Sequence, residues 1–130
     1  MEFSSLRWAD VIVGAPVGRI DHASAETFQL ALEPLLVAAA GLNGSLVLDL
    51  SGVDYVSSVG LRVVMMAAKH LRARKARIAA AALQPVVREI FEIARFNHVV
   101  ELYPSVDEAL QALSPPARLA YQTEPGQSTS

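Results

Sequence analysis

Residues 45–64, SLVLDLSGVDYVSSVGLRVV, decide the fold because they place a buried strand shortly before a helix. The run 45–50 is apolar and has no long polar face, which is typical of a strand covered by helices on both sides. From residue 59 to residue 74, apolar residues recur every three or four positions, which predicts a helix. Ser57 and Ser58 lie just before that helix, where a serine hydroxyl commonly caps the first turn.

The rest of the chain alternates between strand and helix patterns in the same way. Further strands are predicted over 3–8, 11–20, 77–83 and 99–103, and further helices over 25–40, 85–95 and 104–113. Pro16 donates no ladder hydrogen bond, so its strand is expected near a sheet edge or with a bulge. Ser24 is expected to cap the helix over 25–40, and Pro34 predicts a kink in that helix or its division in two. Short crossovers in this order predict an α/β layer structure with mostly parallel neighbouring strands.

The chain has 130 residues, which suits one domain. We assign residues 1–113 to that domain. After Leu113 the composition turns to proline, glycine, serine and threonine without a sustained apolar period. Such a segment cannot bury enough apolar surface to offset its ordering entropy, so we predict a flexible C-terminal tail over 114–130.

The composition argues against several classes of function. A net charge of −2 gives no reason to expect binding to nucleic acid, and the absence of cysteine excludes disulfides and thiolate chemistry. No run approaches the roughly 18 apolar residues of a membrane helix, and the N-terminus lacks the pattern of a signal peptide. The three histidines have no ligand-like spacing, and the glycines form no phosphate-binding loop. We therefore expect a cytoplasmic protein that is not an enzyme, binds no metal or cofactor, and does not insert into membranes.

The two serines admit two interpretations. The simpler one is helix capping, which is worth about 1 kcal/mol. The other is regulation, because a helix N-terminus tolerates an anion and a phosphate adds a charge of about −1.5 to −2. Arg62 and Met66 lie on the helix face opposite the apolar stripe, where a flexible methionine is either part of an adaptable docking surface or a half-buried rim residue. Asp21 is either a member of the same site or a turn and cap residue.

Three segments, in order along the chain, resemble the STAS family, which includes the anti-sigma factor antagonists. They are VGRIDHASA (17–25), LVLDLSGVDYVSSVGLRVV (46–64) and FNHVVELYPSVDEALQAL (96–113), and the resemblance covers about residues 8–113. It implies a mixed, mostly parallel sheet of four or five strands with helices mainly on one side. Ser58 matches the serine that is phosphorylated in the family motif, Gly60 and Leu61 match its glycine and leucine, and Asp21 matches its loop aspartate.

The resemblance implies an anti-sigma factor antagonist of the bacterial cytoplasm that regulates sigma-factor-dependent transcription. The implied partners are an anti-sigma factor that is often a serine kinase, and a serine phosphatase that reverses phosphorylation. The family has an aspartate where this chain has Ser57, which leaves three alternatives open. Ser58 is the acceptor, Ser57 is the acceptor, or the domain binds constitutively as a scaffold subunit of a transporter or stress-signalling complex. The predicted partner-binding residues are Asp21, Ser57, Ser58, Gly60, Arg62 and Met66.

Overall fold

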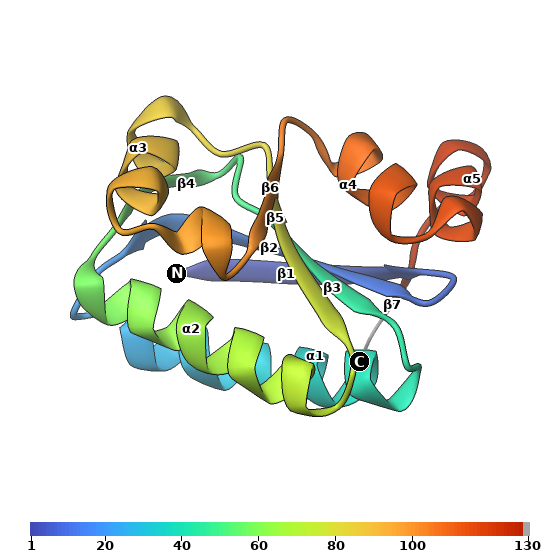
Figure 1. Ribbon diagram of the computed structural model, residues 1–130, viewed down its shortest axis with the longest axis horizontal. Helices are drawn as coiled ribbons and strands as arrows, with labels where there is room; N and C mark the ends of the chain where they lie inside the picture. The colour runs from blue at the N-terminus through green and yellow to red at the C-terminus, as the bar shows by residue number, and fades with distance from the viewer. Residues whose placement is uncertain (129–130) are drawn as a thin grey trace.

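The predicted alternation of strands and helices forms a sheet with helices on both faces in the computed structural model, which describes residues 1–128 (Figure 1). The strands are β1 (Glu2–Trp8), β2 (Val11–Ile20), β3 (Ser45–Asp49), β4 (Val53–Val56), β5 (Arg77–Ala81), β6 (Glu101–Tyr103) and β7 (Gln127–Ser128). The helices are α1 (Ala25–Gly41), α2 (Ser58–Ala73), α3 (Pro85–Ile93), α4 (Val106–Leu113) and α5 (Pro115–Thr123), with a short 3₁₀ helix η1 (Phe96–His98).

The sheet is mixed and mostly parallel, as predicted. Its order is β6-β5-β3-β2-β1-β7, and β4 pairs with the C-terminal part of β2. Among the described strands, β1 pairs antiparallel with both of its neighbours, β2 and β7, and all other pairings are parallel. The structure adds two short strands, β4 and β7, to the five that the sequence pattern predicts.

The strand that contains Pro16 is not an edge strand of the sheet. β2 pairs with β1 on one side and with β3 and then β4 on the other. The alternative prediction of a bulge is confirmed, since the β2–β4 register shifts between Gly18 and Arg19. This irregularity lets the end of β2 leave β3 and lie beside β4, which leads directly into α2.

Side chains of β3 point alternately to the two faces of the sheet and divide the core into two clusters. Leu46 and Leu48 belong to the larger cluster, which α1, α2 and α3 cover, whereas Val47 belongs to a smaller cluster beneath α4 and α5. In Figure 1, α1 and α2 lie side by side below the sheet, and α4 and α5 lie above it. The prediction of a strand buried on both faces is therefore confirmed. Among the described residues, no helix combines the length and hydropathy of a membrane span.

Helix α1 is a single helix that runs through Pro34, so its predicted division in two is wrong. Pro34 itself is exposed, while Leu32, Leu35 and Leu36 on either side of it are buried. Burial of these leucines stabilises the helix although proline cannot donate its backbone hydrogen bond. Ser24 occupies the predicted N-cap position but makes no side-chain capping bond.

The segment after Leu113 corrects the prediction of a flexible tail. Residues Pro115–Thr123 form α5, and β7 pairs with the outer edge of β1. The Ser114 hydroxyl donates to Asp10 Oδ1 at 2.6 Å, and the Tyr121 ring meets the Trp8 ring edge-on with centroids 5.0 Å apart. α5 buries chiefly the small residue Ala117, so its sequence shows no apolar period. Residues 129–130 lie outside the described part.

Candidate functional site

The junction between β4 and α2 is held by Ser57. Its backbone is extended, and its hydroxyl oxygen accepts a hydrogen bond from the Gly60 amide at 3.2 Å. The Ser57 amide in turn donates to the Ile20 carbonyl at 2.8 Å, which ties the start of α2 to the end of β2. The predicted capping role therefore belongs to Ser57.

Ser58 is the first residue of α2 and its side chain is exposed. Its hydroxyl makes no hydrogen bond to any residue within 1–128, in contrast to the hydroxyl of Ser57. Ser58 also lies at a helix N-terminus, where the free backbone amides and the partial positive charge of the helix dipole favour a negatively charged group. The two adjacent serines thus differ, because one hydroxyl completes the fold and the other faces solvent.

Gly60 allows α2 to approach β2 closely. A Cβ atom at this position would lie 2.7 Å from Ile20 Cγ2 and 3.0 Å from both the Ile20 carbonyl oxygen and Val56 Cγ1. Side chains in real structures do not approach neighbours as closely as the first of these distances, so any larger residue would push the helix start away from the strand. Gly60 has a structural role in placing Ser57 and Ser58.

Asp21 lies in the loop between β2 and α1, directly after Ile20, and its carboxylate is engaged within that loop. Oδ1 accepts hydrogen bonds from the amides of Ala23 and Ser24 at 3.1 and 3.2 Å, and Oδ2 lies 3.4 Å from Arg19 Nε. Partial desolvation raises the pKa of Asp21, but the hydrogen bonds from Ser24, Arg19 and Ala23 outweigh it, so that the pKa lies below its ordinary value. Of the two interpretations of Asp21, these contacts match the turn and cap residue.

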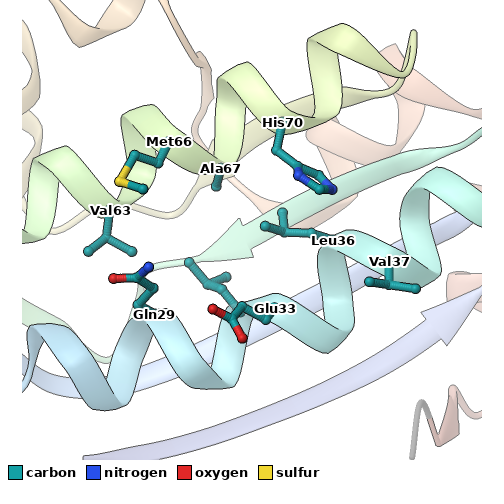
Figure 2. Close-up of a pocket in the computed structure, with 9 residues that line it drawn as sticks. Gln29, Glu33, Leu36, Val37, Val63, Met66, Ala67 and His70 are labelled. Atoms are coloured by element: carbon teal, nitrogen blue, oxygen red, sulfur yellow. The ribbon is translucent and has the colours of Figure 1, made fainter.

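Arg62 and Met66 lie one and two turns after Ser58 along the exposed face of α2. The Met66 side chain is 51% exposed, and it forms one wall of a groove of about 390 Å³ between α1 and α2 (Figure 2). The floor of the groove is apolar, and Gln29, Glu33 and His70 stand at its rim. The groove and the exposed Ser58 thus lie along one helix.

Two features of this region were missed by sequence reasoning. Arg19 lies over the Tyr55 ring, with Cζ 4.4 Å from the ring centroid, and the two residues are cross-strand partners of β2 and β4. The sequence pattern could not predict this contact, because it did not predict β4 as a separate strand. The α1 wall of the groove was also missed, because the sequence gave no indication of how closely α1 and α2 pack. Within residues 1–128, no cluster of three or more metal-ligating side chains occurs.

Comparison with known proteins places this fold and junction in a family. The family model described as the STAS domain matches residues 9–109. The chain belongs to the STAS domain family. Ser57, Ser58 and Gly60 all fall within the matched region of this STAS domain, whereas α5 and β7 lie beyond it.

Two curated relatives of this STAS domain carry provisional names. A protein of Bordetella bronchiseptica, provisionally named anti-sigma factor antagonist BtrV, is 44% identical over 66 residues, which cover 51% of this chain and 57% of the relative. A Mycobacterium tuberculosis protein, provisionally named an anti-anti-sigma factor, is 32% identical over 84 residues, covering 62% of this chain and 57% of the relative. The matched region therefore spans rather more than half the length of each curated relative.

A solved structure supports the fold of the whole domain. The crystal structure of a provisionally named anti-sigma factor antagonist from Thermotoga maritima superposes with a TM-score of 0.77, covering 85% of this chain and 93% of that one. Its sequence identity is 20%, so this likeness concerns the fold alone.

Proposed function

We propose that this STAS domain is an anti-sigma factor antagonist that binds an anti-sigma factor through the exposed N-terminal half of α2. The names of the two curated relatives support this role. The observation that carries the proposal is the difference between the two serines, since Ser57 caps α2 while the Ser58 hydroxyl is exposed and unbonded among residues 1–128. Arg62 and Met66, which are exposed on the same helix, are the further contacts we assign to the partner.

The proposed switch is phosphorylation of Ser58 by an anti-sigma factor that is a serine kinase. The Ser58 oxygen forms a bond to the terminal phosphorus of ATP, the bond from that phosphorus to the leaving ADP oxygen breaks, and the hydroxyl proton is released. The start of α2 can hold the added phosphate without unfolding, because free amides and the helix dipole favour an anion there. A serine phosphatase, the second proposed partner, removes the group by hydrolysis.

The size of the effect follows from electrostatics. Two like charges about 4 Å apart interact by about 4 kcal/mol at an effective dielectric constant of about 20. Because about 1.4 kcal/mol changes an equilibrium constant tenfold, an acidic partner surface at this distance would bind hundreds-fold more weakly after phosphorylation. Ser57 is the less suitable acceptor, since its oxygen already accepts the Gly60 amide and a phosphate there would disturb the cap.

The test compares two substitutions at Ser58 in binding to the purified anti-sigma factor kinase of the same organism, measured by calorimetry. We expect Ser58→Asp to weaken binding about hundredfold and Ser58→Ala to change it little, because charge rather than the hydroxyl decides. Intact-mass measurement after incubation with kinase and ATP should show one added phosphoryl group in the wild type and in Ser57→Ala, but none in Ser58→Ala.

Equal affinity of the Asp and Ala variants would contradict the switch. A stable complex with membrane transport subunits, without any mass change, would instead favour the scaffold role that the family resemblance also allows.

A further inference from the structure

The exposed faces of α1 and α2 carry the same spacing pattern with opposite charge. On each helix a charged residue is followed by an apolar one at i+4, a second charged one at i+7 and a second apolar one at i+11. The residues are Glu26, Leu30, Glu33 and Val37 on α1, and Arg62, Met66, Lys69 and Ala73 on α2. We call these the acidic stripe and the basic stripe.

Both stripes face solvent, and among the described residues the charged side chains of one stripe form no ion pair with those of the other. Leu30, Val37 and Met66 are 58%, 68% and 51% exposed, so each stripe presents large apolar side chains to solvent beside its charges. None of the four charged side chains forms an ion pair within the part of the chain that the structure describes. Between the stripes lies the groove of about 390 Å³, with Leu32, Leu36, Val63 and Ala67 among its lining residues.

The two helices run in the same direction and are nearly level. α1 joins the parallel strands β2 and β3, and α2 joins β4 to β5 in the same sense. Across the groove, Gln29 faces Val63 and Leu36 faces His70 (Figure 2). A residue of α1 is therefore level with the residue of α2 whose number is higher by 34.

We infer that this face binds a second copy of the same chain, in a dimer with a two-fold axis parallel to the helices. Such an axis places α1 of each copy over α2 of its partner, with the helices parallel. An isologous contact needs a self-complementary surface, and an acidic stripe beside a basic stripe of equal spacing provides one. The charge pattern selects this partner over an unrelated helix, because both stripes are matched at once.

The register of the charges supports this arrangement. By the offset of 34, Glu26 is level with Gly60 and Glu33 with Ala67, so each is two residues from a basic residue of the partner. Two residues correspond to about 3 Å along a helix, which long side chains easily span. Two-fold symmetry repeats both pairs, and the groove of one copy then faces the groove of the other, with the exposed Met66 and Val37 of both copies in the contact.

This self-association would cover Arg62 and Met66, two residues of the surface proposed for the anti-sigma factor. The two complexes would therefore exclude one another. The inference does not depend on the proposed function, and its test needs only the purified chain.

The test uses charge reversal and sedimentation velocity at about 10 mM ionic strength, where the Debye length is about 30 Å. We expect the wild type to show a concentration-dependent species with twice the mass of one chain. Glu26→Lys/Glu33→Lys makes both stripes basic, and Arg62→Glu/Lys69→Glu makes both acidic, so each variant alone should associate at least about tenfold more weakly. An equimolar mixture of the two variants should recover the dimer, because each stripe then faces one of opposite charge.

Recovery in the mixture separates a lost contact from a lost fold, since misfolded variants could not complement one another. Glu89→Lys/Glu108→Lys is the matched control, because both residues are exposed and lie outside the two stripes. It should dimerise as the wild type does. A wild type that stays monomeric, a reversal that leaves association unchanged, or a mixture that fails to recover would each overturn the inference. In the first case the stripes would serve a different partner.

Discussion

At the scale of single residues, the site depends on Gly60, because a residue with a side chain would not fit at this position. Gly60 leaves room for the Ile20 backbone, and the Ser57 amide then reaches the Ile20 carbonyl at 2.8 Å. The same turn uses the Ser57 hydroxyl for capping, which leaves the Ser58 hydroxyl exposed. Ser57 therefore caps α2, Ser58 has an exposed hydroxyl, and Gly60 allows the helix to approach β2 closely.

Gly60→Ala is expected to destabilise the domain by about 1–3 kcal/mol, because the new methyl group would overlap Ile20 and shift the start of α2. Gly41→Ala is the matched control, since Gly41 is also helical and a Cβ there meets nothing within 4 Å. In that variant the better helix propensity of alanine should leave stability unchanged or raise it by up to about 1 kcal/mol. Urea unfolding of both variants measures the difference, and equal stabilities would show that α2 can move away from β2 without cost.

At the scale of secondary-structure elements, the C-terminal segment departs most from expectation. α5 is held by residues far away in the sequence, since Ser114 bonds to Asp10 and Tyr121 packs on Trp8. Gly126 also lies close to the Trp8 ring, where a Cβ atom would be 2.6 Å from Cζ2. A segment this short would be marginal alone, and tertiary contacts with the β1–β2 hairpin stabilise it.

Removal of residues 114–130 is expected to lower the free energy of unfolding by about 2 kcal/mol or more, because it uncovers the Trp8 side of β1 and leaves Asp10 without its hydroxyl donor. A chain shortened only to residue 124 keeps α5 and loses β7, so its loss should be below about 1 kcal/mol, since two strand residues add little. Calorimetry of the two shortened chains measures both values. Identical melting of the first chain and the full chain would mean that α5 contributes nothing to the domain.

The local sequence pattern was sufficient to predict those strands and helices that have a clear apolar run or a clear helical period. β3 and α2 were predicted closely because each has a clear period or apolar run, and both are central to the core. β4 was not predicted as a strand, because its four residues include the exposed Asp54 and only pairing with β2 defines it. Local pattern also located both serines at the start of α2, but it did not distinguish the capping Ser57 from the exposed Ser58. The groove beside Met66 required the packing of α1 on α2, which no local pattern encodes.

At the scale of the whole molecule, the sheet separates two hydrophobic clusters that share no side chains. Ile12 lies in the larger cluster and Leu110 in the smaller one, and both are almost fully buried. Contacts therefore do not pass directly from α1 and α2 to α4 and α5, although all of these helices rest on the same strands.

Ile12→Val should cost about 0.5–1.5 kcal/mol and Leu110→Ala about 2–5 kcal/mol. The double variant should lose the sum within about 0.5 kcal/mol, because the two side chains lie in separate clusters on opposite faces of the sheet. Ile12→Val combined with Leu46→Ala is the contrasting pair, since these residues are register partners in the same cluster, and its loss should differ from the sum. Urea unfolding at constant pH measures all variants. Strong coupling between Ile12 and Leu110 would show that the sheet transmits packing changes between its faces.

The contact between Trp8 and Tyr121 has a practical consequence. Trp8 is the one tryptophan of the chain, and its indole nitrogen donates to the Glu124 carbonyl at 3.3 Å. The tryptophan fluorescence of the unlabelled protein therefore comes from a single place, the contact between β1 and α5. Should that helix detach while the rest of the domain stays folded, the emission would shift to longer wavelength as water reaches the indole, and the far-ultraviolet circular dichroism would change little. The molecule thus contains its own optical reporter for the behaviour of its C-terminal segment.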